Sequence, residues 1–390
     1  MVVRVYLKQA WNLMKQNPLF STLYIVGTGI SIVMTMVIAI VYYVRLAPVY
    51  PETNRMRTLV VKSAKMTNDE STHSANISYA MLKDWFYSLE SAEVSTGVSG
   101  TSYARVTNDK EEIPTYARYT DENFFRVFPL VFLEGKPFTE ADRRSGIHNV
   151  VLTDSYAQQL FGTTKGVVGK NFLMDYTNVK VVGVVKSGSF LTPDSYAQVY
   201  LPYSCRDGYD DEGSHWALGG YRVYILMKES KSVTDVQDEV LELIRKFNVS
   251  DMGDGWKLDL VGQPELYWHS TFRLWSNVAV DWGRVIWMFV GIFMVLLFVP
   301  AFNLSGMISA RMERQLPDLG IRKAFGASRR RLLVQIIWEN LLLTGLGTLL
   351  GLVIAWIVLA LSGYEIFSLF EVFPKFPPKG CLLYTSPSPR

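Results

Sequence analysis

The chain has 390 residues, of which 49% are hydrophobic and 19% are charged, and its formal net charge is only +3. So small an excess of cations gives no reason to expect a nucleic-acid partner, because the basic residues cluster beside apolar runs instead. The two cysteines, Cys205 and Cys381, cannot form a disulfide framework; two free thiols are the favoured interpretation, and a single bridge stays open.

Three apolar runs predict membrane-spanning helices. We predict transmembrane helices over residues 19–44, 284–308 and 332–362, since each contains an uncharged stretch long enough to cross a hydrocarbon core of ~30 Å. The first run ends in the bulky pair Tyr42-Tyr43 rather than in small residues. It is therefore predicted to be an uncleaved anchor and not a signal peptide.

A basic segment between the second and third runs orients the chain. Residues 309–331 hold seven cations against Glu313 and Asp318 alone, and basic loops stay on the cytoplasmic side of a membrane. The cations are Arg311, Arg314, Arg322, Lys323, Arg329, Arg330 and Arg331. Residues 1–18 are predicted to form an amphipathic lead on the same cytoplasmic face. Residues 45–283 must then lie outside.

Residues 45–283 have the composition of a globular domain with mixed patterning. Two strand–helix–strand units are predicted, one on each side of a middle piece, with Ser78 and Ser232 as the caps of their helices. The predicted elements are, in chain order, residues 57–62, 78–89, 94–106 and 113–119, and then 221–227, 232–247 and 256–260. This recurrence suggests one α+β unit interrupted by an insertion.

The middle piece, at about residues 121–220, is predicted to be β-rich. Short strands separated by Gly, Pro, Asn and Asp turns are expected at residues 149–153, 170–174, 179–185 and 198–201. One short helix is expected over residues 154–161, with Asp154 as its cap. The predicted fold class is an α-helical transmembrane bundle that carries a large α+β extracytoplasmic domain with a β-rich subdomain inserted in it.

No pattern in the sequence predicts catalysis, a metal site or a cofactor. The histidines have no metal-ligand spacing to one another or to cysteine; they are His73, His148, His215 and His269. Residues 166–171, GVVGKN, superficially resemble a phosphate loop but lack its spacing and its Ser or Thr, and a strand is predicted to follow. We therefore predict no nucleotide-binding site, no metal and no catalytic residue within these 390 residues.

Small residues recur along the third predicted span. Gly345, Gly347 and Gly351 lie in it, and the last two are spaced as GxxxG. This spacing lets two helix backbones approach closely. We predict that the three glycines serve helix packing, with a dimer as one arrangement that would use them.

The end of the chain differs from the rest. Residues 363–379 are predicted to form an extracytoplasmic loop. Residues 380–390, GCLLYTSPSPR, have neither periodicity nor apolar length, and they resemble the translated read-through of a sequencing adapter. We expect a non-native tail there, with a further span missing from the chain.

Residues 319–330, LGIRKAFGASRR, closely resemble the permease subunits of the MacB/FtsX-like ABC transporter family. The family pattern is close to E-[IL]-G-[IL]-R-[KR]-A-[LM]-G-A-[ST]-R/K, and the chain departs from it with Asp318 in place of Glu and Pro317 before it. The outer region matches the family's extracytoplasmic core domain in order, at residues 123–128 (NFFRVF), 133–138 (LEGKPF), 150–153 (VVLT) and 182–185 (VGVV). Together the matches reach from the first span to about residue 362.

The resemblance implies four spans, a dimer in the bacterial cytoplasmic membrane, and an outer porter-like unit interrupted by the β-rich subdomain. It also implies a separate ATPase that binds ATP and docks on a short cytoplasmic helix at about residues 313–325, where Pro317 suits the first turn and Gly326 the stop. The docking residues that it points to are Asp318, Leu319, Ile321, Arg322, Lys323 and Phe325. Further implied partners are membrane lipid and a periplasmic adaptor or substrate protein.

The leading hypothesis is a transporter permease without its own nucleotide-binding site, which couples ATP hydrolysis by its partner to movement of the outer domain. In the family such movement is mechanotransmission, with exported peptides, antimicrobial peptides among them, lipoproteins or drugs as substrates. An alternative is a membrane-anchored extracytoplasmic sensor or binding module, which would ordinarily carry a longer cytoplasmic output domain. An ecto-enzyme is a third hypothesis, and it would need a catalytic cluster that the sequence does not show.

Overall fold

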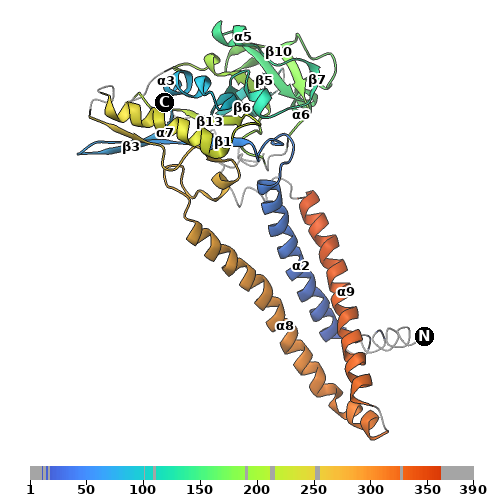
Figure 1. Cartoon of the computed structure of the whole chain (residues 1–390). Coiled ribbons are helices and arrows are strands. Elements are labelled where there is room, and N and C mark those ends of the chain that lie inside the picture. The colour runs from blue at the N-terminus through green and yellow to red at the C-terminus, as the bar shows by residue number, and fades with distance from the viewer. Residues whose placement is uncertain are drawn as a thin grey trace, which may run out of the picture. The chain divides into compact units, whose positions relative to one another are not determined.

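The computed structural model describes Trp11, Lys15 and residues 18–100, 102–108, 111–188, 192–210, 216–250, 255–325 and 328–361. Contacts divide the chain into two compact units. The globular unit is Tyr43–Trp282, and the helical unit combines Met1–Tyr42 with Gly283–Arg390 (Figure 1). Apart from Trp11, Lys15 and Pro18, the predicted lead over residues 1–18 lies outside the described residues, as do the predicted loop at 363–379 and the tail at 380–390.

The described part of the helical unit consists of α2 (Pro18–Leu46), α8 (Trp282–Ala324) and α9 (Arg329–Leu361). Two of these helices contain a stretch long and apolar enough to cross a membrane, Ser21–Ile40 with a mean hydropathy of 2.2 and Ile336–Ile357 with 1.9. In α8 the apolar stretch that is described is shorter, Trp282–Phe298. Two of the three predicted spans thus have the length and composition of a membrane span.

α8 differs from the predicted course of its region. The sequence predicts a span that ends at residue 308, and the family resemblance implies a short separate helix at about residues 313–325 with Pro317 in its first turn. Instead, α8 runs through Pro317 to Ala324 as one helix of 43 residues, so the prediction of a separate helix is wrong. A proline removes one backbone hydrogen bond from a helix interior, but the good helix formers on both sides, such as Leu316 and Lys323, favour continuation.

The globular unit contains two sheets, and the first is antiparallel. Among the described residues its order is β14-β2-β3-β13-β1-β15, with β4 paired to β13 and β12 to β3. Its strands are β1 (Thr58–Val61), β2 (Ala64–Thr67), β3 (Thr72–Ile77), β4 (Ala92–Ser99), β12 (Leu218–Gly219), β13 (Tyr221–Met227), β14 (Lys257–Asp259) and β15 (Glu265–Leu266). The strands predicted at 57–62, 221–227 and 256–260 are confirmed as β1, β13 and β14.

The helices of the first sheet, α3 (Tyr79–Asp84) and α7 (Val233–Val249), begin at the predicted caps. The Ser78 hydroxyl accepts a hydrogen bond from the Met81 amide at 3.0 Å, and Ser232 forms a capping box with Asp235. Both caps are confirmed. The helix predicted over 78–89 is shorter, because α3 passes into the 3-10 turn η1 (Phe86–Ser88).

The second sheet closes on itself. Its order is β7-β10-β8-β11-β6-β5-β9, and β9 also pairs with β10, so six strands form a ring to which β7 is attached. Its strands are β5 (Ser102–Asn108), β6 (Glu111–Thr120), β7 (Phe132–Gly135), β8 (Asn149–Thr153), β9 (Asn171–Met174), β10 (Thr177–Val185) and β11 (Val199–Pro202). Closure pairs the edge strands with each other, which removes the free edges of an open sheet.

The ring begins earlier in the chain than the predicted insertion. The sequence places the start of the insertion at about residue 121, but β5 and β6 already belong to the ring. The single strand predicted over 94–106 is in fact two strands, β4 in the first sheet and β5 in the ring. Local pattern cannot assign them, because the assignment rests on long-range pairing such as that of Ala117 with Val199.

The ring carries three short helices, α4 (Phe124–Val127), α5 (Glu140–Arg144) and α6 (Asp154–Phe161). α6 has the predicted bounds, but its N-cap is Thr153, so the predicted cap at Asp154 is wrong. The Asp154 carboxylate instead accepts hydrogen bonds from the amides of Ser155 at 2.8 Å and Ser187 at 2.9 Å. It therefore ties the first turn of α6 to the end of β10.

Three clusters of buried side chains form the core of the globular unit. One packs the first sheet against α3 and α7, and another packs the ring strands against α6. The third combines residues of both sheets, among them Val60, Phe124, Phe128, Tyr200 and Tyr224. Alternation along β1 sends Leu59 and Val61 to the first cluster and Val60 to the third. An apolar layer thus joins the two sheets.

Candidate functional site

The last turns of α8 carry the residues that the sequence predicts to form a docking site. Ile321 lies in the last turn of α8, and Phe325 directly follows that helix, with its amide donating to the Ile321 carbonyl oxygen at 3.1 Å. Their side chains are 57% and 88% exposed. Lys323 is exposed as well. The side chains of Asp318, Leu319 and Arg322 lie outside the part of the chain that the structure describes. Two large apolar side chains are thus left uncovered by the described residues.

On α9, Gly347 and Gly351 lie against α2, and the two helices run side by side (Figure 1). A Cβ on Gly351 would come within 2.7 Å of the Gly29 carbonyl oxygen, and one on Gly347 within 2.8 Å of Thr28 Cβ. Only glycine lets the backbones approach this closely. A Cβ on Gly345 would meet nothing within 4 Å among the described residues, so Gly345 takes no part in this contact.

The contact between α2 and α9 also has a polar element. The hydroxyls of Tyr24 and Thr344 are hydrogen-bonded at 2.9 Å, and Tyr24 is buried. On α9, Leu343 and Ala355 are buried too. The sequence leaves open whether the glycines serve packing within one chain or in a dimer. In the structure, Gly347 and Gly351 contact a helix of the same chain.

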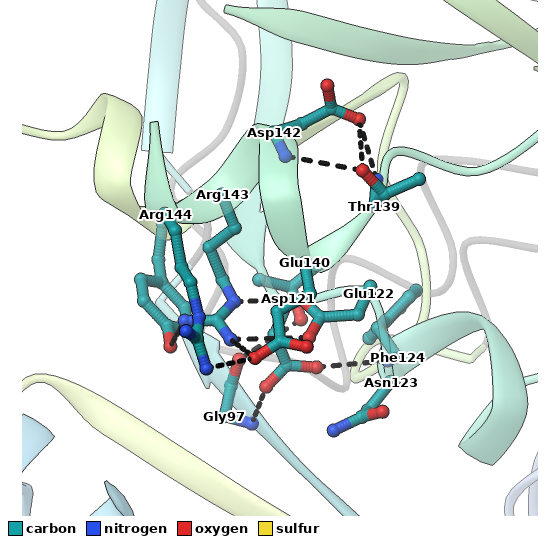
Figure 2. Close-up of polar contacts among 12 residues, drawn as sticks. Gly97, Asp121, Glu122, Asn123, Phe124, Thr139, Glu140, Asp142, Arg143 and Arg144 are labelled. Carbon is teal, nitrogen blue, oxygen red and sulfur yellow. Dashed lines mark hydrogen bonds and ion pairs between the residues drawn. The ribbon is translucent and has the colours of Figure 1, made fainter. Parts of the chain in front are cut away.

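In the globular unit, Asp121 joins the ring to the first sheet (Figure 2). It follows β6 and is fully buried. Its carboxylate accepts hydrogen bonds from β4, namely from the Thr96 hydroxyl at 2.6 Å and the Gly97 amide at 2.8 Å. The Tyr87 hydroxyl at 2.6 Å and the Phe124 amide at 3.1 Å complete the set. Burial raises the pKa of Asp121 to about 6, although its hydrogen bonds act to lower it.

The neighbouring Glu122 adds an ion pair beside the hydrogen bonds of Asp121. Arg143 of α5 donates from Nε to Glu122 Oε2 at 2.8 Å (Figure 2) and from Nη1 to the Tyr203 hydroxyl at 2.9 Å. The Tyr203 hydroxyl lies 3.3 Å from the Tyr87 hydroxyl, which in turn donates to Asp121. Glu122, Arg143, Tyr203, Tyr87 and Asp121 thus form one polar network. Burial alone would lower the pKa of Arg143, but Glu122 outweighs it and raises that pKa, so the ion pair stays charged.

A second buried carboxylate, Asp194, lies between β11 and the first sheet. Its Oδ1 is 3.2 Å from Arg222 Nη1, and its Oδ2 is 4.0 Å from Lys62 Nζ. Burial would raise the pKa of Asp194, but Lys62 and Arg222 hold it well below its usual range. Burial lowers the pKa of Lys62, against the attraction of Asp194. Charges in this interface are paired, as burial requires.

The chain enters and leaves the globular unit on neighbouring strands, because β1 pairs with β15. Before β1, Glu52 and Arg55 form a buried ion pair, and the Ser195 hydroxyl donates to Glu52 at 2.7 Å. After β15 begins, Glu265 and Arg273 form a second buried pair at 2.7 Å. Burial raises the pKa of Glu52, against the effect of Arg55. Both connections to the long helices are thus fixed within the globular unit.

Sequence reasoning missed these polar groups and the α2 side of the glycine contact. Asp121 comes directly after a strand, where solvated acids are common, so its sequence position does not indicate burial. Its partners Tyr87 and Thr96 lie more than twenty residues earlier in the chain. Gly29 could have been found, since it lies in a run of small residues, Gly27-Thr28-Gly29, within an apolar helix. Within the residues that the structure covers, no group of three His, Cys, Asp or Glu could hold a metal ion.

Two family models match the chain. One, described as the MacB-like periplasmic core domain, matches residues 20–243, and the other, described as FtsX-like permease C-terminal, matches residues 277–384. The first alone covers more than half of the chain. The chain therefore belongs to the MacB/FtsX-like family of ABC transporter permeases, and its two candidate spans and globular unit fit a membrane permease with an extracytoplasmic domain.

Curated relatives are considerably longer than this chain. It is 22% identical over 268 residues to "Macrolide export ATP-binding/permease protein MacB" of Escherichia coli (strain K12), covering 67% of this chain and 39% of the relative. It is 25% identical over 237 residues to "Pyoverdine export ATP-binding/permease protein PvdT" of Pseudomonas entomophila (strain L48), covering 59% of this chain and 34% of the relative. The chain thus spans little more than a third of the length of these relatives.

Among solved structures, the periplasmic region of MacB from Actinobacillus actinomycetemcomitans is similar to 52% of this chain. The match covers 89% of that chain at 17% identity, and its TM-score is 0.37. The family assignment rests on the two family models.

Proposed function

We propose that this chain is the permease subunit of an ABC-type transporter and couples ATP hydrolysis by a separate ATPase to conformational change in its globular unit. The continuity of α8 supports this proposal most directly. α8 begins at Trp282, the last residue of the globular unit, and continues to Ala324. Its 43 residues extend over roughly 65 Å, about twice the ~30 Å of a hydrocarbon core. An unbroken helix transmits a displacement at one end to the other.

The proposed topology is multi-pass in the bacterial cytoplasmic membrane. Residues 1–18 and 309–331 lie in the cytoplasm, and the globular unit lies in the periplasm. Three spans cross the bilayer, in α2, α8 and α9. The cations between the second and third spans support this orientation. The apolar stretch of α8 up to Phe298, with Trp287 75% and Phe293 64% exposed, suits contact with lipid or with a second copy of the chain in a dimer.

The proposed contact with the ATPase is the cytoplasmic end of α8. Ile321 and Phe325 form its apolar part, since this chain leaves them exposed, and Leu319 joins them. Asp318, Arg322 and Lys323 contribute charge beside them. ATPase closure would displace this end of α8 and move the globular unit. We propose export or mechanotransmission as the output, with peptides, lipoproteins or drugs as substrates and a periplasmic adaptor or substrate protein as a further partner.

The test is co-purification of the full-length protein in detergent from its native cell, followed by assay of ATPase activity. We expect an ATPase to co-purify, and we expect Ile321→Asp and Leu319→Asp to reduce the bound activity by on the order of tenfold or more, equivalent to about 1.4 kcal/mol of binding. Leu241→Asp is the matched control, because Leu241 is an equally exposed leucine (56%) on α7 of the globular unit. Absence of any ATPase, or equal activity in the Ile321 and Leu241 variants, would refute the proposal.

A second candidate function is a membrane-anchored binding module. A pocket of about 390 Å³ beside β3 and β12 favours it, with His73, Arg206, Tyr209 and Tyr221 among its lining residues. A cation and aromatic rings around one cavity suit a small polar ligand. This candidate predicts that Arg206→Ala abolishes ligand response in cells while Ile321→Asp has no effect, which is the reverse of the transporter proposal.

A further inference from the structure

The segment between η4 (His269–Phe272) and α8 exposes apolar side chains at the edge of the globular unit. Leu274 and Trp275 are each 67% exposed and Val278 is 50% exposed. Residues 274–280, LWSNVAV, carry no charge. Adjacent exposed apolar side chains in an uncharged segment are typical of a surface that contacts a membrane or another molecule.

The backbone of this segment is firmly held from beneath. The Arg273 side chain, which is 2% exposed, donates from Nε to Glu265 Oε1 at 2.7 Å and also to the carbonyl oxygen of Val278. The Ser63 hydroxyl donates to the carbonyl oxygen of Ser276. The Val278 amide donates to the Trp275 carbonyl at 3.1 Å. These bonds hold the backbone of residues 275–278 against the globular unit, and in this arrangement the side chains of Leu274 and Trp275 are exposed.

The same segment lies close to the start of α8. The Trp282 ring, with which α8 begins, contacts the rings of His269 and Phe272, with centroids 5.1 Å and 5.9 Å apart. The apolar stretch of α8, Trp282–Phe298, starts only four residues after Val278. If α8 crosses the bilayer, the exposed patch therefore lies within a few residues of the point in the chain where the helix leaves it.

We propose that Leu274, Trp275 and Val278 insert into the interfacial layer of the outer leaflet and seat the globular unit on the lipid. The inference rests on the proposed function, because it takes α8 as a span. Lipid is the occupant because the patch precedes the apolar stretch of α8 by only four residues in the chain, and because an indole with its N–H suits the boundary between headgroups and acyl chains. With the patch held in the interfacial layer, a movement of α8 would reach β15 through the Arg273–Glu265 ion pair. It would then reach β1, which is paired with β15.

The experiment places one nitroxide label at a time on the full chain, in a background in which Cys205 and Cys381 are replaced by serine. The labelled variants are Leu274→Cys, Val278→Cys, Tyr176→Cys and Val290→Cys. Each is reconstituted into phosphatidylethanolamine and phosphatidylglycerol vesicles, and power saturation compares collision with oxygen, which prefers lipid, and with a water-soluble nickel chelate. Tyr176 is the exposed control, since it is 85% exposed in the ring far along the chain from α8. Val290 reports on α8 within its apolar stretch.

We expect the labels at 274 and 278 to show an oxygen-to-nickel ratio several times that of the label at 176, and lower than that of the label at 290. A water-like ratio at 274 and 278 together with a lipid-like ratio at 290 overturns this inference and leaves the proposed span intact. A water-like ratio at 290 overturns the proposed function itself. Protection of 274 and 278 from both reagents would mean that protein covers the patch, which also overturns the inference.

Discussion

The globular unit and the helical unit keep their structures by different means. In the globular unit, large side chains such as Phe124 and Tyr200 are fully buried, and charged groups in the interior, Asp121 and Asp194 among them, have partners. In the helical unit, the contact between α2 and α9 is made by glycine backbones, while Trp356 on α9 is 71% exposed. The globular unit therefore buries its own apolar side chains, as a protein in water must. The helical unit needs lipid or another chain to cover its exposed apolar side chains.

Phe124→Ala tests the apolar layer between the two sheets and has the largest expected effect. Phe124 is fully buried and packs against Phe128 and Tyr200, with ring centroids 4.9 Å and 5.4 Å away. We expect the variant to lose about 3–5 kcal/mol of unfolding free energy, because it leaves a cavity in the core. Pulse proteolysis of the globular unit in urea measures this, with Tyr176→Ala as the exposed control. A loss equal to that of the control would contradict the proposed role of the layer.

Asp121→Asn tests how the ionisation of the buried Asp121 carboxyl, between the ring and the first sheet, affects stability. Because burial raises the pKa of Asp121 from 3.8 to about 6, the folded protein keeps a proton there that the unfolded chain loses between about pH 4 and pH 6. The stability from this proton is complete below pH 4 and is lost as the pH rises through 6. The unfolding free energy of the wild type minus that of Asp121→Asn should fall by up to about 3 kcal/mol over this interval.

The measurement is urea unfolding of both proteins at pH 4.5 and pH 7. Any change in stability that asparagine causes by its shape is the same at both pH values. A change with pH in the difference between the two proteins therefore reports on the Asp121 carboxyl alone. Glu70→Gln, at an exposed position between β2 and β3, serves as the control for removal of a carboxylate. A difference that stays flat or rises with pH would show that the hydrogen bonds at Asp121 outweigh its burial.

Gly351→Val tests whether glycine backbones hold the helical unit together. A Cβ at this position would come within 2.7 Å of the Gly29 carbonyl oxygen, so α2 and α9 must separate. We expect a loss of about 1–3 kcal/mol, seen as a lower thermal transition in detergent. Gly345→Val is the matched control, since it carries the same cost of valine in a helix but meets no atom within 4 Å among the described residues. Equal transitions for both variants would argue against the contact.

Ser232→Ala has the smallest expected effect and concerns a helix end at the surface of the globular unit. It removes the capping box of α7, in which the Ser232 hydroxyl accepts from the Asp235 amide. The expected loss of unfolding free energy is about 1 kcal/mol. For Ser232→Gly it should be only about a few tenths of a kcal/mol, because glycine tolerates the cap conformation. Urea unfolding of the globular unit distinguishes the two. An alanine variant as stable as the glycine variant would show that the cap is unimportant.

Local sequence pattern predicted many elements because it depends on neighbours in the chain. β8 and β13 have the predicted bounds, and Ser78 and Ser232 cap helices as expected. The pattern failed where two elements compete for the same residues. It joined β4 and β5 into one strand, because the partner of a strand is not visible in a short window. The family resemblance implied a separate helix at about residues 313–325, where α8 is in fact continuous.

By itself, the sequence determined the apolar runs, the basic segment at residues 309–331 and the family motif within it. These follow from composition and order along the chain, and the family models agree with them. Only the tertiary structure decided that β5 pairs with β9 and so closes the ring, that Gly351 meets Gly29, and that a buried carboxylate at Asp121 joins two sheets. Each of these contacts links residues that different segments bring together, so no local periodicity encodes it.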